Sequence, residues 1–493
     1  MVRRTTELIR WYLIVLFFLT TYQSANAAAA EPQRPNILWL IVEDMSPYFG
    51  CYGTRDIKTP AVDALASGGL QFTRAFTTAP ICSTSRSALI TGMYQTSIGA
   101  HHHRSGAGTD KIHLPDNVPL VPALFKQAGY YTINSGYYPA TRAGKTDYNF
   151  VYPVDLYDGT DWKERKPGQP FFAQIQLLGG KIRDIPREIA RARERLGSST
   201  PADTVTLPPY YPRTPAVLDD WAATLDAIRI TDEYVGEIVA RLRREGLLEN
   251  TIIFFITDHG VSHGRGKQFL YDEGLHIPFI IHGPGIPAGA RRNDLVEHID
   301  LAATSLALAG IPIPRTMHAK DILAKDYQPR TFSYAARDRA DETVDRIRSV
   351  RSDRWKYIRN FYPQRPYLQP NNYKDHKPCL VALRAAQREG LLDAVQKLHF
   401  AETRPAEELY DLQADRWEVH NLASNPAHSQ TLVQLRGQLN KWMEETADQG
   451  RTSESEVRYD SDMAAYLQSQ QQPRRGEIER NIELMKKWAR EGK

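Results

Sequence analysis

Long apolar runs dominate the pattern of residues along this chain. ILWLIV at 37–42 and TIIFFIT at 251–257 are nearly uninterrupted, and PFFAQIQL at 170–177 predicts a further strand. Continuous apolar runs of this length are typical of strands buried on both faces, as in parallel sheets. Helical spacing of apolar residues occurs between and after these runs, at 59–72, 121–131, 217–246 and 291–314. We therefore predict an α/β fold with a large central mixed, mostly parallel sheet flanked by helices.

The pattern changes beyond residue 330. Short strand-like runs such as RIRSVRSDRWKYIRNF replace the long apolar ones, and a helix is expected across 380–398. This pattern of short strands predicts a smaller C-terminal α+β subdomain with an antiparallel sheet at 330–450. The large domain that precedes it is expected at 34–325. A polar helical tail follows at 451–493.

The amino terminus has the features of a secretory signal. It begins MVRR, continues through an apolar core from Trp11 to Leu19, and ends Ser24-Ala25-Asn26-Ala27. We expect a signal peptide at 1–27, cleaved after Ala27, and a periplasmic or secreted protein. Because the apolar core is too short to span a bilayer comfortably, we expect no stable membrane insertion, with an uncleaved anchor as the alternative.

Composition narrows the classes of function. The chain has 493 residues, 42% of them hydrophobic, and a formal net charge of only +4, which argues against a dedicated nucleic-acid-binding protein. It has three cysteines, Cys51, Cys82 and Cys379. If Cys82 is used chemically, the other two are left either as a disulfide or as two free thiols.

Two buried strands each end in a pair of metal-capable residues. Glu43 and Asp44 follow the first apolar run, and Asp258 and His259 follow the run at 251–257. Ligands in open α/β sheets bind at the carboxyl ends of the strands, so these residues are expected to meet. They offer mainly hard oxygen ligands, which suit a calcium-type divalent ion, while His259 would also accept a softer metal.

The segment Cys82-Ser83-Thr84-Ser85-Arg86 places a cysteine among small hydroxyl residues, directly before the helical stretch SALITGMY. We therefore expect Cys82 at a helix start, where unpaired N–H groups favour an anion and lower the pKa of a thiol. The alternative is an unreactive buried cysteine beside a helix cap.

The run C-S-T-S-R-S-A-L-I-T-G resembles the signature of the formylglycine-dependent (type I) sulfatases of the alkaline phosphatase-like superfamily, usually C-x-P-S-R, with Thr84 in place of proline. The resemblance extends over residues 35–425. It implies that a maturation enzyme oxidises Cys82 to formylglycine, whose hydrate attacks sulfur while held on calcium. Glu43, Asp44, Asp258 and His259 would be the other metal ligands, since the family usually has Asp-Asp and Asp-Asn or Asp-His there.

The same resemblance assigns further residues. Arg86, Lys145 of the Gly144-Lys145 element and Lys267 before a Y-x-x-G turn match pocket cations of the family. Lys181 stands where the family has a histidine near the leaving group, and His103 is a candidate contact for a negatively charged sugar, with an exposed loop as its alternative. Lys267 is our first choice for the leaving-group acid and Lys181 the second.

These matches imply hydrolysis of sulfate esters, or of sulfamates, on a sulfated carbohydrate. Two alternatives remain open from the sequence. One is a phosphate or phosphonate ester hydrolase of the same superfamily, and the other is a weakly active sulfatase-like protein that binds sulfated glycans without turnover.

Overall fold

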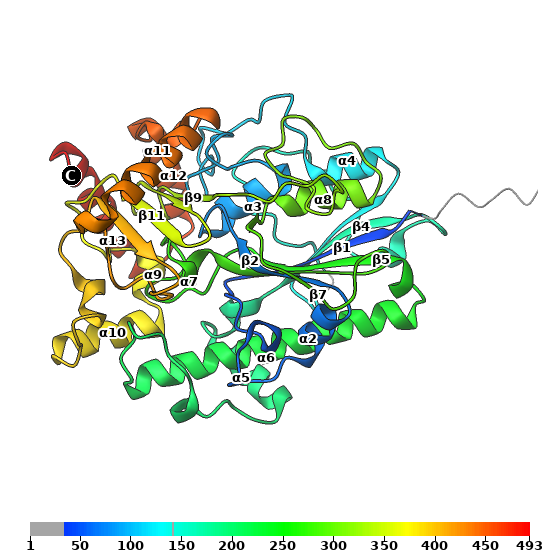
Figure 1. Ribbon diagram of the computed structural model, residues 1–493, viewed down its shortest axis with the longest axis horizontal. Coiled ribbons are helices and arrows are strands. Elements are labelled where there is room, and N and C mark those ends of the chain that lie inside the picture. Colours follow the sequence, from blue (N-terminus) through cyan, green and yellow to red (C-terminus); the bar gives the residue numbers. More distant parts are fainter. Residues whose placement is uncertain (1–33, 141) are drawn as a thin grey trace, which may run out of the picture.

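A computed structural model describes residues 34–140 and 142–493; the expected signal peptide lies outside these residues. Eight strands form the central sheet (Figure 1). In spatial order they are β3 (Tyr131–Ser135), β4 (Phe171–Leu177), β1 (Asn36–Val42), β5 (Thr251–Thr257), β6 (His276–His282), β2 (Leu70–Phe76) and β7 (Ala290–Arg292), with β8 (Val296–Glu297) also paired to β2. The neighbours β3–β4–β1–β5 are all parallel, whereas β6 is antiparallel to both β5 and β2. The predicted mixed, mostly parallel sheet is therefore confirmed.

Successive side chains of β1 point to opposite faces of the sheet and pack into two separate hydrophobic cores. Leu38, Leu40 and Val42 pack in one cluster, and Ile37, Trp39 and Ile41 pack in the other. All of these side chains are almost completely buried, which explains why the strand has no polar alternation.

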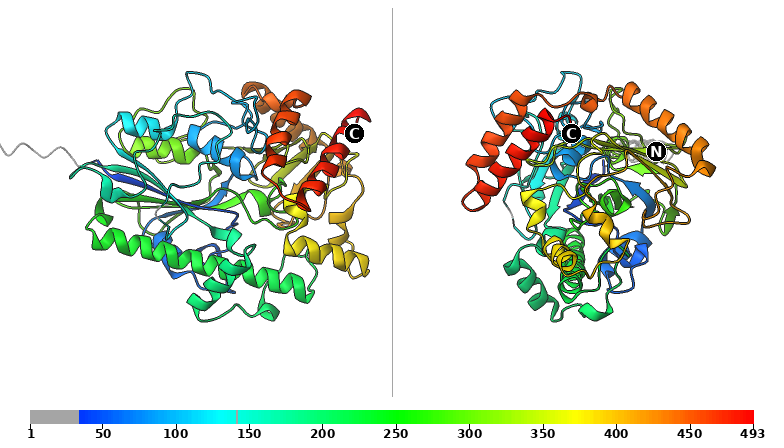
Figure 2. Two further views of the ribbon diagram at one scale, coloured as in Figure 1. Left: turned by 180° about the vertical axis from the view of Figure 1, so that it is seen from behind. Right: turned by 90° about the vertical axis from the view of Figure 1, so that its left-hand side faces the viewer.

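Helices cover both faces of the sheet (Figures 1 and 2). On one side lie α2 (Pro60–Ser67), α5 (Pro186–Leu196), α6 (Pro215–Arg244) and α10 (Pro378–Arg388). On the other side lie α3 (Cys82–Thr91), α4 (Val121–Gln127) and α8 (Asp300–Leu308). The region 291–314 thus holds a shorter helix than predicted, because its first residues form β7 and β8.

The C-terminal region adds a small antiparallel sheet at one end of the molecule (Figure 1). Its strands, in spatial order, are β12 (Glu407–Asp411), β11 (Trp355–Asn360), β10 (Ile347–Arg351) and β9 (Ser333–Arg337). Helices surround it: α7 (Asp272–Leu275), α9 (Asn372–Asp375), α11 (Ser429–Glu445), α12 (Glu456–Gln468) and α13 (Arg474–Arg490). None of the helices among the described residues combines the length and apolarity needed to cross a bilayer.

Candidate active site

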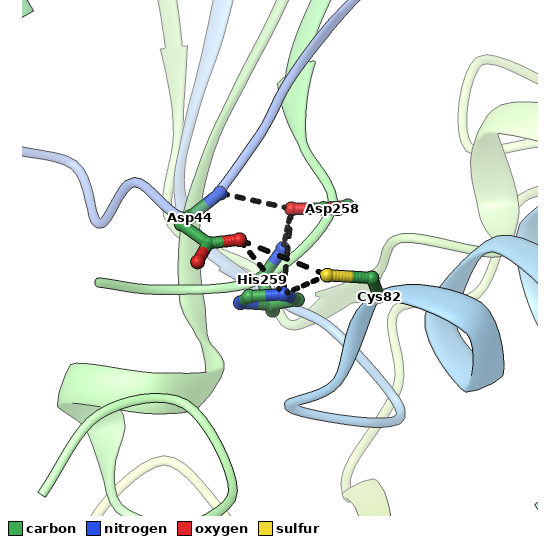
Figure 3. Close-up of side chains that lie close together, drawn as sticks. All are labelled: Asp44, Cys82, Asp258 and His259. Atoms are coloured by element: carbon green, nitrogen blue, oxygen red, sulfur yellow. Dashed lines mark hydrogen bonds and ion pairs between the residues drawn. The ribbon is translucent and has the colours of Figure 1, made fainter. Parts of the chain in front are cut away.

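The carboxyl ends of β1 and β5 bring two acidic residues and a histidine together. These strands pair in parallel, with Val42 beside Thr257, so the residues that follow them emerge side by side. The backbone N–H of Asp44 donates to Asp258 Oδ1 at 3.1 Å, and His259 Nε2 lies 3.3 Å from Asp44 Oδ1 (Figure 3). Asp44 adopts a positive φ of 53°, a conformation that costs a non-glycine residue energy and is often found at functional sites.

Cys82 faces this group from the first turn of α3. Its Sγ lies 3.2 Å from His259 Nε2 and 3.7 Å from Asp44 Oδ1 (Figure 3). One donor atom from each of Asp44, Cys82, Asp258 and His259 fits within 4.8 Å of the others, and all four residues are buried. The predicted helix start at Cys82 is confirmed. The expected lowering of the thiol pKa is wrong, however, because burial raises the pKa of Cys82 despite nearby Lys145 and Lys267.

Burial sets the charge states in this group. It lowers the pKa of His259 to about 4, although Asp258 and Asp44 act in the opposite direction. The imidazole is therefore neutral at neutral pH, the form that binds metals. Burial by itself would raise the pKa of Asp44, but Lys267 and the surrounding positive charges hold it well below its usual range, so this carboxylate is ionised.

Glu43 points away from this group and toward several cations. Its Oε1 accepts from Arg86 Nη2 at 3.1 Å and lies 3.0 Å from Lys145 Nζ, while Oε2 pairs with Lys181. Arg86 also donates from Nε to Asp258 Oδ2 at 3.3 Å. The structure thus joins three of the predicted cations, Arg86, Lys145 and Lys181, through Glu43. The Glu43 carboxylate lies outside the four-residue cluster.

Lys267 is a buried cation in contact with the cysteine. Its Nζ donates to Cys82 Sγ at 3.0 Å and to Asp44 Oδ2 at 3.2 Å. The side chain is enclosed and has two anionic or polarisable partners, so a solvated surface charge is excluded. Lys181 differs from Lys267 in its pKa. Burial, assisted by the charge of Lys267, lowers the pKa of Lys181 to about 7.

His103 is buried, which excludes the alternative of an exposed loop. Its Nδ1 lies 2.9 Å from Asp341 Oδ1, and burial lowers its pKa although Asp341 raises it. Asp341 also lies 4.0 Å from Arg104, which pairs with Asp147, and Asp147 in turn pairs with Lys145. A chain of ionic contacts therefore connects His103 to the cations around Glu43.

Comparison with known proteins agrees with this arrangement. The profile of the Sulfatase family matches residues 35–311, and that of the N-sulphoglucosamine sulphohydrolase C-terminal region matches residues 260–375. An ulvan-active sulfatase of Formosa agariphila is 35% identical over 462 residues, covering 86% of this chain and 77% of the relative. This chain belongs to the sulfatase family.

Other relatives extend over most of the sulfatase chain. Human N-sulphoglucosamine sulphohydrolase is 27% identical over 468 residues, covering 84% of this chain and 91% of the relative. A solved structure of a 2-O GAG sulfatase superposes with a TM-score of 0.60 at 20% identity, covering 87% of this chain and 98% of that chain. The latter similarity supports the fold.

The sulfatase signature departs from its usual form at Thr84, and the structure explains how the departure is accommodated. Thr84 lies in the first turn of α3, where backbone N–H groups have no partner within the helix. Its hydroxyl donates to the carbonyl of Ile81 at 2.9 Å. Proline and threonine are both compatible with this position, because neither removes a helical hydrogen bond there.

Three polar residues of the sulfatase site were not identified from the sequence. Tyr137 donates to Glu43 Oε1 at 2.7 Å, Gln176 accepts from Arg86 Nη1 at 2.8 Å, and Tyr373 donates to Asp44 Oδ2 at 3.1 Å. Gln176 had a detectable signal, since it is a polar residue within an otherwise buried strand. The two tyrosines lie in segments without a recognisable motif.

The two remaining cysteines form no bridge. Cys51 and Cys379 are free thiols, as is Cys82. Cys379 belongs to the buried cluster beneath α6, and Cys51 packs against the same cluster. Of the two alternatives left by the sequence, free thiols are the one observed.

Proposed function

We propose that this sulfatase hydrolyses sulfate esters, or sulfamates, of a sulfated carbohydrate. The observation that carries the proposal is the position of Cys82 Sγ, which lies between the metal-capable group and the ammonium of Lys267. A sulfate has a spread negative charge, so its transfer requires fixed positive charges around the attacked atom. Arg86 and Lys145 supply such charges beside the same group.

A divalent metal fits the donor set. Asp44 and Asp258 offer buried oxygens, His259 is neutral, and these donors come within 4.8 Å of one another with Cys82. We propose that these residues hold calcium, the ion favoured by hard oxygen ligands, and that Glu43 contributes through its charge. When bound, such an ion would supply Lewis-acid stabilisation of developing negative charge.

The nucleophile is proposed to derive from Cys82. Oxidation of its side chain to formylglycine by a maturation enzyme, followed by addition of water to the aldehyde, would supply a hydroxyl that can attack sulfur. The thiol itself is poorly suited to this role, because burial raises its pKa and keeps it protonated. The position at the start of α3 directs unpaired N–H groups toward an anion.

Lys267 and Lys181 remain the candidates for protonating the leaving oxygen or nitrogen. Lys267 Nζ is the better placed, since it lies 3.0 Å from Cys82 Sγ. Lys181 has the pKa nearer neutrality, about 7, but its ammonium is engaged by Glu43. We propose Lys267 as the donor to the leaving group and Lys181 as a cation that neutralises Glu43.

The substrate class follows from the relatives' names, one acting on ulvan and another being an N-sulphoglucosamine sulphohydrolase. We propose that the substrate is a sulfated polysaccharide or a fragment of one. The enzyme would encounter this substrate outside the cytoplasm, after export and removal of residues 1–27. The alternative enzymatic activity is hydrolysis of phosphate or phosphonate esters. The alternative to an enzyme is a protein that binds sulfated glycans without turnover.

The first test is mass spectrometry of the tryptic peptide containing Cys82, from protein produced in its own host. We expect the mass of the aldehyde or its hydrate in place of the thiol. A Cys82→Ser protein, prepared in parallel, provides the unmodified reference in the same peptide. An intact thiol throughout the sample would remove the proposed nucleophile.

The second test compares release of sulfate and phosphate. Matured protein is given 4-nitrophenyl sulfate, 4-nitrophenyl phosphate and ulvan oligosaccharides, with Cys82→Ala as the matched control. We expect faster hydrolysis of the sulfate ester, loss with Cys82→Ala, and loss after EDTA that calcium reverses. Faster phosphate hydrolysis would favour the alternative activity, and saccharide binding without sulfate release would favour the binding protein.

A further inference from the structure

A large cleft is lined by residues other than those of the active site, starting with Ser46, two residues after Asp44. It has a volume of about 670 Å³ and is formed by the loop after β1, the start of α6 and the loop after β12. Among the described residues that line it, none is Cys82, Arg86, Lys145, Lys181 or Lys267. Its size is that of a pocket for a small ligand or a short oligomer.

Aromatic side chains form the walls of this cleft. Tyr48 packs edge-to-face on Trp221, with ring centres 5.5 Å apart, and Tyr210 packs likewise on Trp417 at 6.0 Å. Tyr48 and Trp417 are only partly buried, and the guanidinium of Arg416 lies over the Trp417 ring, 4.5 Å from its centre. Flat apolar rings of this kind can bury the C–H faces of sugar rings while their polar edges bind hydroxyl groups.

Positive charge surrounds the opening. Arg55, Arg291 and Arg416 line the cleft and are exposed, and within the described part of the chain they form no ion pair. The carboxylates of the inner wall are already neutralised by internal cations: Asp272 pairs with Arg351 and Lys356, and Glu418 pairs with Lys356. Asp56 also lines the cleft without an ion pair among the described residues, so the free guanidinium groups of Arg55, Arg291 and Arg416 outnumber the partly exposed free carboxylate. Guanidinium groups suit sulfate and carboxylate ligands.

One polar group in the cleft lacks a partner. Glu273 is about nine-tenths buried and lines the cleft, and its Oε1 has no hydrogen-bond partner among the described residues. Its Oε2 accepts from Tyr211 at 2.6 Å. A buried polar atom without a partner is costly, but this atom is itself enclosed, so it does not face a ligand in the cleft.

We propose that this cleft is a second carbohydrate site, which binds an anionic, sulfated oligosaccharide segment away from the reacting sulfate. The sugar rings pack against Tyr48 and Trp417, and the guanidinium groups bind sulfate. The sulfated class of ligand rests on the proposed function, whereas the presence of a saccharide site rests on the cleft itself. Such a site would retain a polymer near Cys82 between turnovers.

Calorimetric titration tests this proposal with full-length protein carrying Cys82→Ser, which cannot turn the ligand over. The probe is a size-fractionated ulvan oligosaccharide, compared with the same fraction after chemical desulfation. The cleft variant is Arg55→Gln/Arg416→Gln, and the matched control is Arg187→Gln/Arg191→Gln on the exposed surface of α5. Both double variants remove two positive charges from exposed positions.

We expect two binding sites per chain, with the affinity of one reduced about tenfold by the cleft variant and unaffected by the control variant, because each lost guanidinium contact weakens binding severalfold. A single site, or two sites that both survive the cleft substitutions, would overturn the proposal. Hydrolysis of 4-nitrophenyl sulfate by the same double variants with Cys82 intact is expected to be unchanged. Failure of the enzyme on every sulfate ester would contradict the proposed function, while the binding stoichiometry would still decide on the cleft.

Discussion

At the residue scale, Glu43 organises the positive charges of the active site. Its carboxylate is completely buried and contacts Arg86, Lys145 and Lys181 together with the hydroxyl of Tyr137. Several buried cations close together would repel each other strongly without an anion between them. The longer glutamate side chain thus reaches Lys145 and Lys181, which form no ion pair with Asp44 or Asp258, while Arg86 also contacts Asp258.

Lys267 provides the sharpest test of the proposed chemistry. Lys267→Met keeps the length of the side chain but removes the ammonium that donates to Cys82 Sγ and Asp44. We expect kcat/KM for 4-nitrophenyl sulfate to fall by about 10²–10³-fold, the usual effect of removing one preorganised charge at a reacting group. Steady-state kinetics of matured protein measures this effect.

The control for that substitution is Lys441→Met on the exposed face of α11, which is expected to leave kcat/KM unchanged. Circular dichroism of both variants separates a chemical effect from unfolding. Activity of Lys267→Met within twofold of the wild type would exclude this lysine from the reaction.

Glu273 makes stability depend on pH. Burial raises its pKa to about 7, against an ordinary 4.5, despite the hydrogen bond from Tyr211 and the charge of Arg265. The folded state therefore retains a proton that the unfolded state has lost, and this group's contribution to stability declines as pH rises from about 4.5 to about 7.

Glu273→Gln should remove that dependence while retaining an acceptor for Tyr211. We expect the free energy of unfolding of the variant, relative to the wild type, to rise by about 3 kcal/mol between pH 4 and pH 8. Urea denaturation across this range measures the difference, in which the contributions of all other groups cancel. A constant difference would show that Glu273 has an ordinary pKa.

At the scale of elements, α3 depends on its ends. Its start presents Cys82, and its last turn closes at Gly92, which has a φ of +64° and donates its N–H to the carbonyl of Ala88. A β-carbon at Gly92 would lie 2.9 Å from Met317 Sδ and 3.2 Å from the β-carbon of Ala302. Glycine is thus required both by the left-handed backbone and by the close packing of α8.

Gly92→Ala is therefore expected to lower the free energy of unfolding by about 1–3 kcal/mol. Thermal or urea denaturation measures the loss. Gly437→Ala is the control, since Gly437 lies within α11 with no atom near its added β-carbon, and this change should stabilise by about 0.5–1 kcal/mol. Equal effects of the two substitutions would contradict the role assigned to Gly92.

The sequence predicted elements well where one physical signal was strong. The runs at 37–42 and 251–257 were predicted as buried strands and form β1 and β5, and the helix start predicted at Cys82 is the start of α3. It failed where elements are short or polar. The strands β7 and β8 have three and two residues, too few for a periodic pattern, and the charged helix α5 was not predicted.

At the scale of the whole molecule, the C-terminal tail completes the neighbourhood of the site. Asp462 of α12 accepts hydrogen bonds from Arg339 and from the backbone N–H groups of Gly106 and Gly108. Arg339 in turn donates to the carbonyl of His103 at 3.1 Å. A segment to which the sequence assigned no function thus fixes the loop that carries His103.

Asp462→Asn should weaken this attachment. The substitution removes a buried negative charge opposite Arg339, so we expect a loss of about 2–4 kcal/mol in the free energy of unfolding. Asp460→Asn on the exposed side of the same helix is the control and should change stability by less than about 1 kcal/mol. Urea denaturation compares the two, and equal losses would contradict a structural role for Asp462.

The limits of sequence reasoning are also clearest at this scale. The proximity of the residues after β1 and β5 could be predicted from the sequence, because parallel neighbouring strands end at one edge of a sheet. No local rule places Tyr373 beside Asp44, or Asp341 beside His103, since each pair is separated by more than 200 residues. These contacts depend on how the small sheet packs against the large domain.

The burial of Cys82 has a consequence for the order of events in the life of the chain. Its side chain is only 3% exposed and lies in the first turn of a helix held between two layers. Any enzyme that oxidises this residue needs an extended, accessible segment, so it must act on the nascent or unfolded chain. If Cys82 is oxidised as proposed, folding and modification therefore compete in time, and every molecule that folds first would keep an unmodified thiol.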